Sequence, residues 1–143
     1  MKLFKPLSLS VILVLLIGCS SEKTPSQVYD EYNSKVINRI NINDDKAYYS
    51  KRKQDEVESK FPEYMKKMDK SREEVIEFYL NFSRELAKCK ELKLVSEVII
   101  GEGAILKYSQ KDICGNATDT EERQLIRMIN EGGWKIDDIE ISL

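Results

Sequence analysis

The spacing of hydrophobic residues changes once along the chain, near residue 90. Before that point, apolar residues recur every three or four positions, as on one face of a helix. After it they alternate with polar residues or form short runs rich in valine and isoleucine, as in strands. The order of the two patterns predicts an α+β fold in which N-terminal helices pack on an antiparallel sheet.

The first predicted helix covers residues 25–40. Thr24 and Gln27 form a capping box, and Pro25 occupies the first helical position, where its missing N–H costs nothing. The apolar residues that follow at helical spacing are Val28, Tyr32, Val36 and Ile40.

Two further helical segments follow the polar stretch 41–45. In the first, Asp44 or Asp45 is the predicted cap, the residues from Lys46 to Lys60 are mostly charged, and Pro62 is expected to interrupt the helix. The second begins with the capping box of Ser71 and Glu74. It carries the strongest apolar stripe of the chain, which we expect to face the core: Val75, Phe78, Tyr79, Phe82, Leu86 and Cys89.

Four strands are predicted from residue 92 to the end. They read LKLVSEVII, AILKYSQ, EERQLIRMIN and WKIDDIEISL, and the glycine-containing turns GEG and EGG join the first pair and the last pair. Consecutive strands joined in this way predict a four-stranded antiparallel meander.

The last strand breaks the two-residue period. Trp134 and Ile136 share one parity, whereas Ile139 and Ile141 share the other, so a regular strand would place the two sets on opposite faces. Either an extra residue at Asp137–Asp138 forms a β-bulge that returns both sets to one face, or the strand is buried on both sides.

The N-terminus has the pattern of an export signal. Lys2 and Lys5 precede an apolar run of 12 residues, 7–18, which is shorter than the roughly 20 residues that span a bilayer as a helix. The run ends in Leu16-Ile17-Gly18-Cys19, which resembles the lipobox of bacterial lipoproteins. The alternatives are an ordinary signal peptide with an incidental cysteine, or an uncleaved anchor.

The lipobox resemblance implies that the chain is cut before Cys19 and that Cys19 is acylated. Residues 1–18 would then be a signal peptide, 19–23 a lipidated tether and 24–143 a single domain. Two or three acyl chains anchor a protein stably, so the membrane would be its first partner. Ser20, following the cysteine, implies by the same resemblance an outer-membrane location, on the periplasmic face, in an organism that has two membranes.

The charge, cysteine content and histidine content of the chain exclude some classes of partner and ligand. Cleavage would remove Lys2 and Lys5 and change the formal net charge from −2 to −4, which argues against binding nucleic acid. The other two cysteines, Cys89 and Cys114, would be exported to an oxidising compartment, where an even pair predicts a disulfide. The chain has no histidine, so we expect no metal site, and we expect no cofactor.

The order of the elements resembles the small NTF2-like, cystatin-related lipoproteins. The resemblance rests on the segment TPSQVYDEY, on the helix in the middle of the chain and on the final hairpin MINEGGWKIDDIEI, with an acidic-glycine turn and Trp134. It implies a strongly curved sheet that encloses a cavity beneath the helices. The aromatic residues expected to line that cavity are Tyr32, Tyr79, Phe82 and Trp134.

The sequence contains no recognisable catalytic motif. There is no glycine-rich phosphate loop, no GxSxG motif and no cysteine–histidine pair. An aspartate–tyrosine pair is left open by Asp30, Asp112, Asp137 and Asp138, although none lies in an apolar run that would raise its pKa. We therefore expect no enzyme, and the isomerase-type cavity enzyme is the least favoured hypothesis.

The function that the sequence favours is a non-catalytic binding domain tethered to the cell envelope. It would hold a small apolar ligand, or a segment of another envelope protein, on the concave face of the sheet. The alternative is a protein-interaction or immunity-type lipoprotein that binds its partner through its surface.

Overall fold

A computed structural model describes residues 22–115 and 122–142. The helices are α1 (Pro25–Ile37), α2 (Ile42–Tyr48), α3 (Lys51–Met68) and α4 (Arg72–Lys88). The strands are β1 (Lys90–Ile100), β2 (Gly103–Asp112), β3 (Glu122–Asn130) and β4 (Trp134–Ser142). The predicted signal peptide, the lipobox and Cys19 lie outside the described residues.

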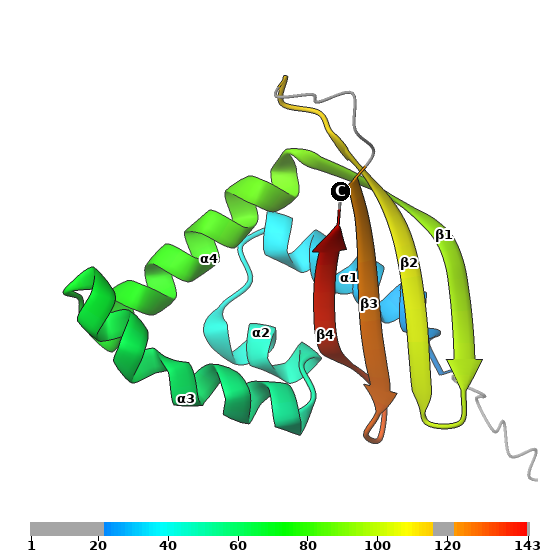
Figure 1. Ribbon diagram of the computed structural model, residues 1–143, viewed down its shortest axis with the longest axis horizontal. Coiled ribbons are helices and arrows are strands. Elements are labelled where there is room, and N and C mark those ends of the chain that lie inside the picture. The colour runs from blue at the N-terminus through cyan, green and yellow to red at the C-terminus, as the bar shows by residue number, and fades with distance from the viewer. Residues whose placement is uncertain (1–21, 116–121, 143) are drawn as a thin grey trace, which may run out of the picture.

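The four strands form one antiparallel meander in the order β1-β2-β3-β4, as the sequence predicts. The sheet is curved, and α1 lies across one of its faces (Figure 1). α3 and α4 form a hairpin that extends away from the sheet and returns to it only at the two ends (Figure 1). The α+β fold class is therefore confirmed.

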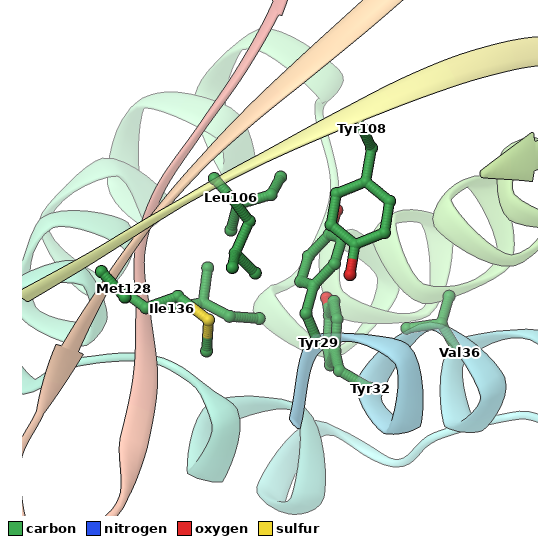
Figure 2. Close-up of a cluster of buried hydrophobic side chains, with 9 residues drawn as sticks. Tyr29, Tyr32, Val36, Leu106, Tyr108, Met128 and Ile136 are labelled. Carbon is green, nitrogen blue, oxygen red and sulfur yellow. The ribbon is translucent and has the colours of Figure 1, made fainter. Parts of the chain in front are cut away.

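The core lies between α1 and the middle of the sheet. Tyr29 and Tyr32 of α1 point toward the strands, where Leu106 and Tyr108 of β2 meet them (Figure 2). The hydroxyl of Tyr29 donates to Gln124 Oε1 at 2.8 Å, and such a partner is what a buried tyrosine requires. The buried members of this core are Tyr29, Tyr32, Val36, Ala104, Leu106, Tyr108, Ile126, Met128 and Ile136.

The predicted bulge in β4 is confirmed. Arg127 pairs with Asp138 and Met128 pairs with Ile136, so Asp137 is the extra residue. Asp137 in turn fixes the start of α3, because its Oδ1 accepts hydrogen bonds from Ser50 Oγ at 2.6 Å and from Arg52 Nε at 2.9 Å. The bulge thus aligns the apolar side chains of β4 and positions a helix.

The helical region between α1 and α4 differs from the prediction. α1 ends at Ile37, α2 is capped by Asn41 instead of an aspartate, and Pro62 lies inside α3 without ending it. A proline inside a helix removes one backbone hydrogen bond. Packing compensates here, because the neighbouring Phe61 is buried beneath the guanidinium of Arg72, 4.5 Å from the ring centre.

The expectation that the α4 stripe faces the core is wrong for most of its length. Only Val75 is buried, whereas Phe78, Tyr79, Phe82 and Leu86 are all about half exposed. The reason is the arrangement of the α3–α4 hairpin, which touches its neighbours near its ends and leaves the middle of α4 uncovered. The exposed stripe borders the hollows described below.

The C-terminal end of α4 is joined to the loop after β2. Cys89 and Cys114 lie at disulfide distance, with an S–S separation of 2.06 Å, as the sequence predicts. On the chain-entropy model, closing a loop of 25 residues stabilises the folded chain by about 3 kcal/mol. This bond fixes one end of α4 to the sheet.

Candidate functional site

Two neighbouring hollows open between the helices, and together we call them the bay. The groove, of about 560 Å³, lies between α1, α4 and the helix-covered face of the sheet. The pocket, of about 320 Å³, lies between α2, α3 and α4. Tyr49 and Tyr79 line both hollows, so the groove and the pocket share a wall.

The groove has a mixed lining. Ile139 and Ile141 of β4 and Leu86 of α4 supply apolar surface, while Gln110 and Gln124 lie on the floor. Gln124 donates to Gln110, and Gln110 donates to Glu122, so the floor amides are already hydrogen-bonded. The groove is therefore an open, partly apolar surface whose floor amides are satisfied within the protein.

The pocket is more apolar and more enclosed. Its apolar lining comes from all three helices around it: Ile42, Val57, Phe61, Tyr64, Val75 and Tyr79. Asp45 of α2 also lines the pocket, although only 4% of its surface is exposed. A carboxyl group in such surroundings needs a hydrogen-bond donor or a cation.

A tyrosine hydroxyl donates a hydrogen bond to one oxygen of the Asp45 carboxyl group. Tyr32 donates to Asp45 Oδ1 at 3.1 Å, and the hydroxyls of Tyr32 and Tyr49 lie 2.7 Å apart, so Tyr49 donates to Tyr32. Within the described part of the chain, Asp45 Oδ2 accepts no hydrogen bond from a side chain or an amide. One oxygen of the carboxyl is therefore free to accept a donor from a ligand.

The lysines that line the pocket are engaged with other carboxylates. Lys46 Nζ lies 3.1 Å from Glu58 Oε2. Lys53 Nζ lies 3.3 Å from Glu56 and 3.4 Å from Asp138. Asp45 is thus the one carboxyl in the pocket lining, and the structure gives it no cationic partner among the described residues.

Burial raises the pKa of Asp45 from 3.8 to about 6, and the hydrogen bond from Tyr32 opposes this shift. Burial is also the largest cause that raises the pKa values of Tyr32, Tyr49 and Tyr79, so the three hydroxyls remain protonated at neutral pH. At neutral pH the site therefore presents a carboxylate beside neutral hydroxyl groups.

Replacing Asp45 by asparagine should stabilise the protein at pH 7.5 and leave its stability nearly unchanged at pH 4. The folded-state pKa exceeds the unfolded-state value, so the folded state binds more protons between pH 4 and 6, and wild-type stability falls as the pH rises through that range. A shift of this size corresponds to about 3 kcal/mol. Asparagine keeps the acceptor for Tyr32 but cannot ionise.

Urea unfolding of the Asp45→Asn variant and of the wild type, at both pH values, measures the difference. Asp44→Asn is the matched control, because Asp44 is exposed on the same helix. A wild type whose stability rises relative to the Asp45→Asn variant between pH 4 and 7.5 would contradict the raised pKa.

The structure brings together only two of the four aromatic residues that the sequence assigns to a cavity. Tyr32 and Tyr79 both line the groove. Phe82 is 54% exposed and stacks on Phe78, with ring centres 5.9 Å apart. Trp134 lies elsewhere, in a separate depression beside Val28.

Asp45 is the residue that sequence reasoning missed, because its place near a helix start was interpreted as a cap. The signal that could have found it is the four-residue spacing from Asp45 to Tyr49, which places an acid and a phenol on one helical face. Burial of that face depends on α3 and α4, and the local sequence gives no indication of it.

The aspartates left open as catalytic groups all have other partners. Asp30 accepts the hydroxyl of Tyr108 at 2.9 Å, and Asp112 accepts the backbone N–H of Cys114 at 2.8 Å. Asp137 binds the start of α3, and Asp138 lies 3.4 Å from Arg127. None of the four lines the pocket.

Among residues 22–115 and 122–142, no group of acidic or cysteine side chains could hold a metal ion. In the same ranges, every helix is too short or too polar to cross a bilayer. Comparison of the chain with protein-family models, curated proteins and solved structures finds no match.

Proposed function

We propose that this protein is a lipid-anchored, non-catalytic binding protein of the bacterial cell envelope, and that its pocket holds a small apolar ligand. The observation that carries this proposal is the pocket itself, where a single buried carboxyl group lies among apolar side chains from three helices. Largely apolar walls with a few fixed polar groups are typical of small-molecule sites.

The size and chemistry of the pocket define the ligand class. A volume of about 320 Å³ is at the lower end of the range for ligand sites and suits a compact molecule. Its apolar part would pack against Val57, Phe61 and Val75. Its polar end would carry an N–H, an O–H or an ammonium group, because Asp45 Oδ2 accepts such a donor and no described residue supplies one.

We assign no reaction to the pocket. Asp45 already accepts the hydroxyl of Tyr32, and Lys46 and Lys53 are paired with carboxylates outside the pocket. These contacts orient and neutralise the polar groups of the lining, which is what a binding site requires. The membrane anchor rests on the lipobox resemblance of residues 16–19.

A second candidate function is the docking of an apolar helix from another envelope protein along α4. The specific observation is the exposed stripe of Phe78, Phe82 and Leu86, because contiguous apolar surface of this kind marks interaction sites. An amphipathic helix could place its apolar face on this stripe. The experiment below separates the two functions, because they predict different classes of captured molecule.

Capture of the protein from its own envelope should recover a small molecule with the wild type and lose it with Val57→Arg. Val57 lines the pocket and is 39% exposed, so a long cationic side chain would enter the pocket without disturbing the core. Solvent extraction of the captured protein followed by mass spectrometry is the measurement.

Val95→Arg is the matched control, since Val95 is an exposed valine on β1 and lines neither hollow of the bay. The control should retain the small molecule. Equal recovery from wild type and Val57→Arg would overturn the pocket as the site. Recovery of a protein partner without a small molecule would favour the second function.

A further inference from the structure

The turn between β1 and β2 carries a cluster of exposed aliphatic side chains, including Ile100, the most exposed aliphatic side chain described on the sheet. Ile100 is 73% exposed, and Val98, Ile99 and Ile105 are 49%, 50% and 37% exposed. These four residues, which we call the hairpin tip, surround the turn at Gly101, where a positive φ of 58° suits glycine. Exposing a cluster of aliphatic side chains to water is unfavourable in free energy.

The hairpin tip is apolar on both faces of the sheet. Ile99 pairs with Ala104, which belongs to the face that α1 covers. Val98 pairs with Ile105 on the opposite face, and Ile100 shares that face because side chains alternate along a strand. A partner protein would cover one face of the tip, whereas an apolar medium would surround both.

The hairpin tip lies at the end of the sheet where the described chain begins. The backbone N–H of Ser26, in the first turn of α1, donates to Glu97 Oε2 at 2.8 Å. Figure 1 shows the beginning of α1 and the β1–β2 turn at the same end of the molecule. Four residues separate Cys19 from Thr24, and the five residue steps between them span at most about 18 Å.

From these placements we propose that the hairpin tip enters the interfacial layer of the membrane to which Cys19 is anchored. This inference rests on the proposed lipid anchor, because the anchor holds this end of the domain against the bilayer. The hairpin tip would then be a second point of contact with the membrane, in addition to the acyl chains on Cys19. Two contacts would fix the orientation of the domain and leave the bay open to the periplasm or the cell exterior.

The contact is hydrophobic and not electrostatic. Glu102 lies within the turn and the mature chain has a formal net charge of −4, so anionic lipids would not attract this end of the protein. We therefore expect the hairpin tip to contact the membrane even in vesicles made of phosphatidylcholine alone.

Tryptophan fluorescence in brominated vesicles tests the contact. The lipidated protein carries Trp134→Phe and then either Ile100→Trp or, as a control, Phe82→Trp, which places the reporter on the exposed face of α4. Bromine near the top of the acyl chains should quench the tryptophan at position 100 to roughly half its intensity and leave that at position 82 unchanged. Circular dichroism confirms that each variant is folded.

A second measurement uses the otherwise unchanged chain. The Ile100→Asp variant should transfer between vesicles about tenfold faster than wild type. The reason is that the membrane-bound state loses the favourable burial of one isoleucine side chain. Val95→Asp, on the same strand but away from the turn, should match wild type.

The outcomes distinguish the anchor from the hairpin contact. Vesicle flotation without quenching at position 100, or equal transfer rates for Ile100→Asp and Val95→Asp, would overturn the hairpin contact and leave the anchor in place. Failure of the lipidated protein to float with vesicles would overturn the anchor and the hairpin contact together.

Discussion

Truncation of Leu106 to alanine should lower the free energy of unfolding by about 2–5 kcal/mol. Leu106 has no exposed surface and lies in the middle of β2, the strand from which three core side chains face α1. Removing its branched end leaves a cavity between α1 and Ile126, which pairs with it on β3. Urea unfolding of the oxidised protein measures the loss.

Leu86→Ala provides the comparison, because the same atoms are removed from a side chain that is about half exposed on α4. We expect a loss below about 1 kcal/mol there. Similar losses at the two positions would mean that the α4 stripe is as tightly packed as the sheet core, and would contradict an open bay.

Replacement of Cys19 by alanine should abolish acylation and leave the protein either unprocessed or released from the membrane fraction. The acyl chains on Cys19 are the proposed anchor, on the lipobox resemblance of residues 16–19. A lipidated cysteine provides the two or more chains that stable anchoring needs, and alanine cannot be acylated. Metabolic labelling with a clickable fatty acid, followed by fractionation of the cells, gives the result.

Ser21→Ala is the control, since it changes the same tether and leaves the lipobox intact. We expect labelling and membrane association to persist in this variant. Unchanged fatty-acid labelling of the Cys19→Ala protein would remove the lipobox interpretation.

Local signals in the sequence predicted those parts of the fold that depend on local chemistry. The capping boxes at Thr24 and Ser71, the glycine turns and the parity change at Asp137–Asp138 each act within a few residues, and each is present in the structure. The α+β class follows from the order of those signals. Such features need no knowledge of what packs against them.

The α3–α4 hairpin and the site depend on contacts between distant segments, and the sequence did not predict those contacts. The α4 stripe has the spacing of a buried face, yet periodicity gives no indication that α3 would hold α4 away from the sheet. Asp45 was interpreted as a cap because its burial arises from α1, α3 and α4 together. Pro62 was expected to stop a helix that the packing of Phe61 preserves.

The two proposed contacts place the molecule in a consistent orientation. The hairpin tip and the start of α1 lie at one end of the sheet, whereas the groove extends toward the opposite ends of β1 and β2, where Lys90, Leu92 and Gln110 line it. A ligand could then reach the bay from the aqueous side while the anchor stays in the membrane.

Native mass spectrometry of the wild-type protein, released from its own envelope in mild detergent, is the most direct test of ligand binding. We expect a mass that exceeds the acylated, disulfide-bonded chain by one small molecule, and we expect Val57→Arg to lack that excess while Val95→Arg retains it. A wild-type mass equal to that of the acylated chain alone would contradict the proposed function.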